Sequence, residues 1–200
     1  MTATLERVLE RALADTDDAA HATDQRILDA ALTECAAYGT RRTTMDDVAR
    51  RADVGRMTVF RRFGSKEALV ERLMARELRR FLAHVDEALA PIEDAGERVA
   101  EAFVICVRAV TEHPLIARLA RLEPGATLER MGQGQPSALD LGRAFVAQRL
   151  DPALANRDEV ADLLVRAAAV YALVPGGVVD VRDEDAARGF ARRVLAPLVT

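Results

Sequence analysis

The chain has 200 residues, half of them hydrophobic, with a formal net charge of −4. This length fits one compact domain or a small domain joined to a larger one, and the apolar content is ample for a helical core. Because tryptophan is absent, only 4% of the residues are aromatic and alanine is abundant, the composition favours closely packed helices over sheets.

The charge is distributed unevenly along the chain. Residues 1–39 carry three basic and eight acidic side chains, residues 40–80 carry twelve and six, and residues 81–200 carry thirteen and eighteen. A segment with a net charge of +6 therefore lies between two segments of −5 each. This pattern is expected of a basic DNA-reading unit on an acidic body.

Nothing in the sequence resembles a signal peptide, a membrane span or a metal site. The longest uncharged stretch of the C-terminal half, residues 167–179, is too short to cross a membrane and contains Pro175. The three histidines lack ligand spacing, and Cys35 and Cys106 lie on apolar helical faces, as expected of buried, reduced thiols. Redox sensing by Cys106 is the less favoured alternative. We therefore expect a cytoplasmic protein without a metal or cofactor.

Residues 1–22 are expected to form an N-terminal extension with an additional helix. An apolar stripe from Leu5 to Leu13 precedes an acidic segment of small residues. Because the extension is acidic, a DNA-binding arm is disfavoured. Packing on the next domain and disorder both remain open.

The DNA-binding domain is expected over residues 23–68. Its first helix follows Thr23, an N-cap residue, and stops at Gly39. One face of this helix is apolar and is expected to support the elements that follow. That face comprises Ile27, Leu28, Ala31, Leu32 and Cys35.

Residues 44–66 predict two short helices joined by a tight turn, which is a helix-turn-helix. Thr44 is a suitable N-cap, and two carboxylates in the first turn complement the helix dipole. The turn follows, where Asp53 tolerates a positive φ and Gly55 caps the second helix, residues 56–63.

The second of these helices is predicted to present a basic and partly apolar face. At about 100° per residue, Val59 and Phe63 share the inward face, which turns Met57 and Arg61 outward. Arginine reads guanine edges, Met or Phe contacts a thymine methyl group, and Thr, Arg or Lys holds phosphates. The predicted DNA-binding set comprises Arg41, Arg42, Thr44, Arg56, Met57, Thr58, Phe60, Arg61, Arg62 and Lys66.

About a quarter of the chain resembles the N-terminal DNA-binding domain of the TetR/AcrR family of transcriptional regulators, in the segment ILDAALTECAAYGTRRTTMDDVARRADVGRMTVFRRFGSKEAL. The order of the motifs carries the resemblance: a helix ending in Tyr-Gly, a Thr-Thr pair, the element Val-x-x-x-Thr-Val-Phe-x-x-Phe, and Gly-Ser-Lys-Glu opening a long helix. Asp53, Gly55 and Phe60 stand where the family often has Gly, Ser and Tyr. Phe60 therefore lacks a hydroxyl that often reaches the DNA. An unrelated helical protein with a basic surface helix is the alternative.

The resemblance implies an all-α fold in which a three-helix DNA-binding domain precedes a helical effector-binding and dimerisation domain, residues 69–200. The periodicity agrees, because no strand-like alternation is long enough to contradict it. A long helix from Lys66 to about Ala90 is expected to link the two domains.

The second domain is predicted to contain a central helix over residues 95–112, which is apolar on almost every side. A short helix over residues 115–122, a mobile Gly-rich loop over residues 124–136 and a helix from Ser137 to about Leu150 follow. A mostly apolar effector pocket is predicted among these elements. Its lining comprises Phe103, Val107, Arg108, Leu119, Met131, Phe145 and Tyr171.

The last two long helices are predicted to form a homodimer interface. Residues 157–174 are apolar on more faces than one chain can cover, and residues 183–195 carry a second apolar stripe. In the resembling family this pairing is a four-helix bundle. The predicted interface comprises Leu164, Ala168, Tyr171, Leu173, Phe190 and Val194.

These features predict a repressor that binds an inverted-repeat operator in double-stranded DNA and is released by a small, mostly apolar effector. A DNA-binding regulator that is controlled by a protein partner, or that has no effector, is the alternative. An enzyme is not expected, because the sequence offers no nucleophile–base pair, paired carboxylates or phosphate loop.

Overall fold

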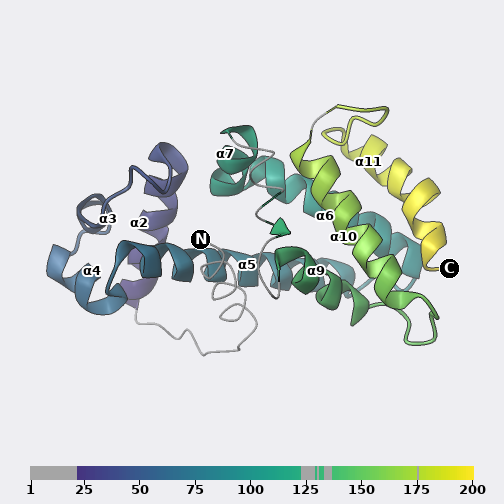
Figure 1. The fold of residues 1–200 in the computed structure, drawn as a ribbon, viewed down its shortest axis with the longest axis horizontal. Coiled ribbons are helices and arrows are strands. Elements are labelled where there is room, and N and C mark those ends of the chain that lie inside the picture. The colour runs from purple at the N-terminus through teal and green to yellow at the C-terminus, as the bar shows by residue number, and fades with distance from the viewer. Residues whose placement is uncertain (1–21, 123–128, 130, 133–136, 175) are drawn as a thin grey trace. The chain divides into compact units, whose positions relative to one another are not determined.

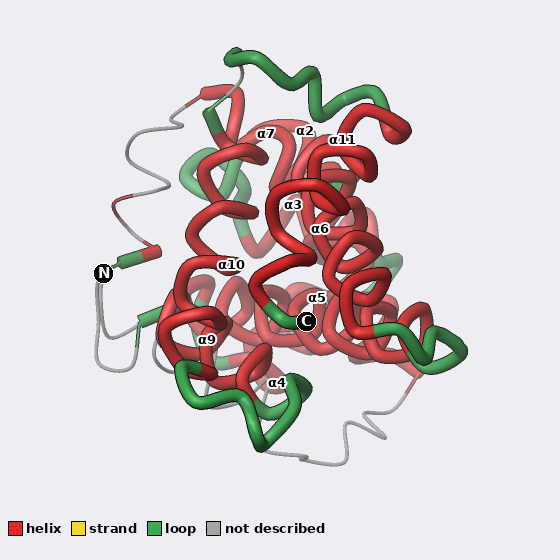
Figure 2. Tube along the Cα trace, turned by 90° about the vertical axis from the view of Figure 1, so that its right-hand side faces the viewer, coloured by secondary structure: helices red, strands yellow, loops and turns green. Residues whose placement is uncertain are grey.

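The computed structural model describes residues 22–122, 129, 131–132, 137–174 and 176–200. Apart from an isolated bridge at Ser137, every regular element within these residues is a helix, which confirms the predicted all-α fold (Figures 1 and 2). The predicted N-terminal extension and most of the predicted loop over residues 124–136 lie outside the described residues. Contacts divide the chain into two compact units, whose boundary in the sequence falls between Arg80 and Phe81.

The first unit contains α2 (Ala22–Tyr38), α3 (Met45–Arg51), α4 (Arg56–Phe63) and the first part of α5 (Lys66–Leu89). α2 begins one residue before Thr23, so Thr23 lies inside the first turn and is not the cap that the sequence predicts. α3 packs on both α2 and α4. Aliphatic side chains form a small core in this unit, including Ile27, Leu28, Val48, Val59 and Leu73, none more than 2% exposed.

The turn between α3 and α4 has the predicted geometry. Asp53 has a φ of 51°, and Gly55 is the N-cap of α4. Arg26 of α2 donates hydrogen bonds to the carbonyl oxygens of Ala52, at 2.6 Å, and Asp53, at 3.1 Å. A charged donor from α2 therefore holds this turn in place.

The second unit contains the end of α5, α6 (Ala95–Glu112), α7 (Pro114–Leu122), α9 (Ala138–Ala147), α10 (Arg157–Leu173) and α11 (Glu184–Phe190). A π-helical segment, η1 (Ala191–Leu195), and a 3₁₀ segment, η2 (Ala196–Leu198), continue α11. α6 packs against α7, α10, α11 and both η segments, and lies between α10 and α11 in Figure 1. Its predicted central position is confirmed.

α9 begins where the sequence predicts and ends three residues early. Ser137 caps it, because the Ser137 hydroxyl accepts from the Asp140 amide at 3.1 Å and the Asp140 carboxylate accepts from the Ser137 amide at 2.9 Å. The helix ends at Ala147, and the amide of Gln148 donates to two carbonyl oxygens of the last turn. The cap at Ser137 follows from the sequence, whereas the reciprocal bond from Asp140, three residues later, is seen in the structure.

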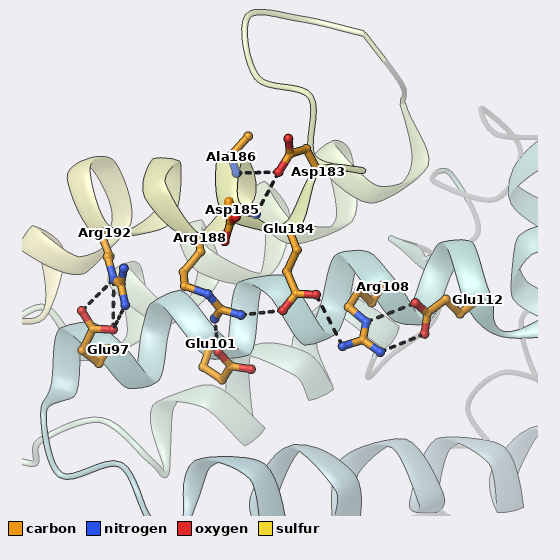
Figure 3. A network of polar contacts seen from close by, with 10 residues as sticks. All are labelled: Glu97, Glu101, Arg108, Glu112, Asp183, Glu184, Asp185, Ala186, Arg188 and Arg192. Carbon is orange, nitrogen blue, oxygen red and sulfur yellow. Dashed lines mark hydrogen bonds and ion pairs between the residues drawn. The ribbon is translucent and has the colours of Figure 1, made fainter.

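Ion pairs line the contact between α6 and the C-terminal helical segment (Figure 3). Arg192 of η1 contacts Glu97 of α6 at 2.7 Å, and Arg188 of α11 pairs with Glu101 of α6. Arg188 also contacts Glu184 one turn earlier, at 2.6 Å. Each pair is partly exposed and stabilises the fold only slightly. The pairs to Glu97 and Glu101 join η1 and α11 to α6.

A second polar contact joins α5 to α9 within the second unit. Arg149, just beyond α9, donates to both carboxylate oxygens of Asp86 at 2.6 and 2.7 Å, and its guanidinium lies 3.4 Å from the centre of the Phe145 ring. The hydrogen bond from Arg149 lowers the pKa of Asp86. This planar, bidentate and stacked arrangement suits arginine and not lysine.

Replacing Arg149 with lysine should therefore lower the free energy of unfolding by about 0.5–1 kcal/mol, because the charge remains while the paired hydrogen bonds and the stacking are lost. Chemical denaturation at pH 7 measures this difference. Arg166→Lys is the matched control, since Arg166 pairs with Asp162 one helical turn away on an exposed surface.

The contribution of the Arg149–Asp86 pair to the free energy of unfolding should also depend on pH. Because the pKa of Asp86 is lower in the folded chain than in the unfolded chain, its stabilising effect is complete above the unfolded value of about 4 and is lost as the pH falls through the folded value. The difference between Arg149→Lys and the parent should shrink below about pH 4. An unchanged difference at pH 3 would contradict this account.

Candidate nucleic-acid interface

The orientation of α4 is the first requirement for an interface with DNA. Val59 and Phe63 are buried, at 0% and 6% exposed, whereas Met57 is 75% exposed and Arg61 is also exposed. The predicted inward and outward faces of α4 are therefore confirmed. Thr58 and Phe60 are partly buried beside the outward face.

The basic side chains of this unit fall into two groups: those that pair with other groups of the protein and those that do not. Arg41, Arg42 and Arg61 are exposed, and their side chains make no hydrogen bond or ion pair with the described residues. A charged group without a partner in the protein is free to bind a phosphate or a base edge. These three arginines are thus the strongest candidates of the predicted set.

Arg62, next to Arg61, is placed quite differently. Its guanidinium pairs with Asp24 of α2 at 2.5 Å, and its side chain is only 25% exposed. Its backbone carbonyl accepts from Arg72 of α5 at 3.2 Å. Arg62 therefore holds α2, α4 and α5 together, and its predicted phosphate contact would compete with the pair to Asp24.

Lys66 and Thr44 are also engaged within the unit. The Lys66 ammonium donates to the carbonyl oxygen of Arg41 at 2.8 Å, which ties the start of α5 to the loop that carries Arg41 and Arg42. Thr44 is the N-cap of α3, as predicted, and its hydroxyl interacts with Asp47. Both residues thus position the surface around α4, and their contacts to DNA stay predictions.

Arg56 is the remaining member of the set, and its contacts were not foreseen from the sequence. It lies 3.0 Å from Asp46 of α3, and its guanidinium lies 5.2 Å from the centre of the Phe60 ring. Asp46 is thus a residue that sequence reasoning missed as part of this surface. No spacing rule pairs residues ten apart across a turn, so only the folded chain could reveal it.

The predicted effector-pocket residues do not form one group. Phe103, Tyr171 and Phe190 meet in an aromatic cluster of α6, α10 and α11, with ring centres 4.9–5.8 Å apart. Val107 is buried in the same core, whereas Phe145 packs with the end of α5 in a different cluster. Of the predicted pocket set, the fold thus brings together Phe103, Val107 and Tyr171, whereas Phe190 was predicted for the dimer interface.

Arg108 differs from the expectation that it lies inside the body. It is exposed, and it pairs with Glu112 at 3.1 Å and with Glu184 at 3.8 Å (Figure 3). The reason is its position on α6, where it faces α11 across the ion pairs and not the apolar core. Met131 is partly buried, and the side chain of Leu119 lies outside the described residues.

The residues predicted for the dimer interface do not share one exposed face either. Leu164 and Leu173 of α10 are buried in the chain's own core, at 8% and 3% exposed, while Val194 of η1 is 51% exposed. Ala168, Tyr171 and Phe190 are partly buried. The exposed large apolar side chains of this region are instead Leu163, Val170 and Val174 at α10 and Val194 of η1.

Neither a reactive thiol nor a metal site is found in the described part of the chain. Burial raises the pKa of the Cys106 thiol to about 11, and burial likewise raises the pKa of Cys35. Both therefore remain protonated near neutral pH. Across these residues, no group of three or more His, Cys, Asp or Glu side chains could hold a metal, and no helix is long and apolar enough to cross a membrane.

Comparison with known sequences places the basic unit in a recognised family. Residues 27–73 match the family described as bacterial regulatory proteins, tetR family. Two uncharacterised HTH-type regulators of Bacillus subtilis are similar to this chain. YvkB is 43% identical over 26% of this chain and 28% of its own length. YhgD is 31% identical over 46% of this chain and 49% of its own length. A third, from Mycobacterium tuberculosis, is 28% identical over 88% of this chain and 84% of its own.

Solved structures extend the likeness in fold to almost the whole chain. Salmonella enterica GusR covers 92% of this chain and 99% of its own, with 20% identity and a TM-score of 0.62. The TetR family repressor AlkX of Dietzia covers 88% and 95%, with 21% identity and a TM-score of 0.54. At these identities, the likeness concerns the fold.

The neighbouring arginines of α4 offer a direct test of the surface. Arg61→Ala should leave the melting temperature unchanged and weaken binding to a preferred duplex by about 1–3 kcal/mol, roughly 5- to 150-fold, because a base-reading group is lost. Arg62→Ala should lower the melting temperature, since it leaves the carboxylate of Asp24 without its partner. Thermal denaturation and fluorescence anisotropy measure the two effects.

Lys66→Ala should change the affinity for DNA in a third way. It should weaken binding to preferred and random duplexes alike and flatten the dependence of affinity on salt, because a phosphate contact releases counterions regardless of sequence. Equal losses on both duplexes for Arg61→Ala as well would show that the base-reading face has been misplaced.

Proposed function

Because the chain belongs to the TetR family of bacterial regulatory proteins and is a DNA-binding transcriptional regulator, we propose that it acts as a homodimeric repressor. A small, mostly apolar effector releases it from an inverted-repeat operator. We assign DNA binding to residues 23–68, and effector binding and dimerisation to residues 69–200. Such a regulator acts in the cytoplasm, and the proposal includes no catalytic activity.

The outward face of α4 carries the DNA-binding part of the proposal. Met57 and Arg61 project from a helix whose opposite side is locked into the core, and Arg41 and Arg42 stand free nearby in sequence, beside the start of α5. One side of the unit thus combines a base-reading helix with cations for the phosphates that flank it.

The aromatic cluster of the second unit supports the effector part. Tyr171 and Phe190 are only partly buried, while Phe103 is 4% exposed, so the cluster extends from the core toward the surface. Aromatic and aliphatic lining with few polar groups suits an apolar ligand. α5 runs from Lys66 to Leu89 across the boundary between the two units in the sequence, and the proposal assigns to it the transmission of the effector signal.

The exposed apolar side chains of α10 and η1 support the dimer. Leu163, Val170 and Val174 recur at helical spacing and are 45–50% exposed, and Val194 is 51% exposed. Exposed apolar side chains at helical spacing on α10 are a normal site for a two-fold interface, and two DNA-reading units then match an inverted repeat.

Val170→Asp should convert the dimer into a folded monomer with little affinity for the operator, because a charge at the interface costs more than the second subunit restores. Light scattering after size-exclusion chromatography measures the mass. Leu173→Asp is the control: it buries a charge within one chain and should unfold the second unit. A wild-type monomer at micromolar concentration would contradict the dimer.

The effector can act only through different affinities for two states of the protein. A tenfold difference corresponds to about 1.4 kcal/mol per site, and by reciprocity the operator weakens effector binding by the same factor by which the effector weakens operator binding. Small apolar compounds that raise the melting temperature should therefore bind about tenfold more weakly, in calorimetry, when the operator is present.

Equal affinities with and without operator would mean that such a compound binds without regulating. If every stabilising compound behaved in this way, the alternative regulator, controlled by a protein partner or by no effector, would replace the repressor proposed above.

A further inference from the structure

The guanidinium of Arg56 is held from two sides at the beginning of α4. The carboxylate of Asp46, in the first turn of α3, lies 3.0 Å from it, and the ring of Phe60, one turn further along α4, lies 5.2 Å from it. Nη1 of the guanidinium donates the hydrogen bond to this carboxylate. The other N–H groups of the guanidinium make no hydrogen bond with the described residues, so they remain able to donate elsewhere.

The stability of the fold does not account for this arrangement. The side chains of Arg56 and Asp46 are 62% and 52% exposed, and an ion pair in such a setting contributes little to stability. The N-terminus of α3 does not require Asp46 either, because Thr44 and Asp47 already form its capping box. Hydrogen bonds from Thr44 and Arg50 lower the pKa of Asp47, so that carboxylate has its own partners.

The charge of Asp46 is unfavourable for DNA binding in general. A carboxylate beside a helix that approaches DNA repels the phosphates, and its removal alone should strengthen binding to any duplex. The presence of Asp46 is explained if it increases the affinity for one preferred base pair by more than its charge lowers the affinity for DNA in general. A free arginine side chain loses rotamer freedom when it docks on a base, and an arginine that is already oriented loses less.

We propose that Asp46 and Phe60 are positioning residues that hold Arg56 ready to donate two hydrogen bonds to a guanine in the major groove. Arg56 is then a specificity-determining residue of this protein. The carboxylate occupies one edge of the guanidinium, the ring supports it from one side, and the free N–H groups face the O6 and N7 atoms of guanine. Phe60 serves here through its ring alone, which fits the absence of a hydroxyl at this position.

This inference rests on the proposed DNA-reading role of α4 and is independent of the effector. The wild-type protein is used to select duplexes from a randomised pool, and base preferences are then compared among the wild type, Arg56→Ala and Asp46→Asn. Arg56→Ala should lose the preference at one base pair in each half-site. Asp46→Asn should relax the preference at the same base pair.

Affinity measurements should give a matching result. On the duplex selected by the wild type, Asp46→Asn should bind about fivefold to tenfold more weakly, while on a random duplex of equal length its affinity should be unchanged or higher. In the Arg56→Ala background, Asp46→Asn should weaken binding no further, because the group that it orients is absent.

Asp53→Asn is the matched control. It removes the same charge from the same helix-turn-helix without contacting Arg56, and asparagine tolerates the φ of 51° at this position. It should strengthen binding to both duplexes alike and leave every base preference intact. Phe60→Leu tests the ring separately and should relax the same base pair as Asp46→Asn.

If Asp46→Asn behaved like Asp53→Asn, Asp46 would only complement the dipole of α3, and the positioning role would be overturned. A relaxed base pair different from that of Arg56→Ala would overturn it as well. If the wild type enriched no sequence from the pool, the DNA-reading role itself would fail, which is a distinct outcome.

Discussion

The complete burial of Ile27, Val48 and Val59 is the constraint on which the DNA-reading unit depends. These side chains come from α2, α3 and α4, and none of them is exposed. α4 has only eight residues and would not persist as an isolated helix. Because its inward face is held by the core, its outward face acquires a fixed direction. The reading surface is therefore a consequence of packing on the opposite side of the same helix.

Polar contacts, in addition to the small core, hold α4 and the segments next to it in place. Arg26 fixes the turn that precedes α4, Arg62 joins α4 to α2, and Lys66 joins α5 to the preceding loop. Each of these basic residues is used by the protein, although the sequence alone shows only a basic cluster. The side chains of Arg41, Arg42 and Arg61 have no such partner among the described residues and remain fully available to DNA, while Arg56 keeps part of its guanidinium free. A high local charge therefore overstates the number of groups that can bind phosphate.

In the second unit, one central helix, α6, packs against several others. α6 is covered by α7, α10, α11 and the η segments, and apolar contacts on one side are accompanied by ion pairs on the side facing α11 (Figure 3). The partly buried aromatic cluster and the exposed face of α10 lie around this framework. The proposed effector and the proposed second subunit would both bind around this framework.

The sequence by itself determined the features that depend on neighbours within one helical turn. The caps at Thr44 and Ser137, the positive φ of Asp53 and the two faces of α4 follow from local chemistry and helical periodicity. The family was predicted from the order of the motifs, and the all-α fold from that resemblance together with the lack of strand-like alternation. The tertiary structure alone decided which face of α10 is free, because a helix that is apolar all round has no phase that its own sequence can reveal.

The tertiary structure also decided the pairing of Asp46 with Arg56, of Asp24 with Arg62, and of Asp86 with Arg149. The residues of these pairs are 10, 38 and 63 positions apart. Hydrogen bonds and ion pairs act over a few ångströms, and only the folded chain brings such groups within that distance.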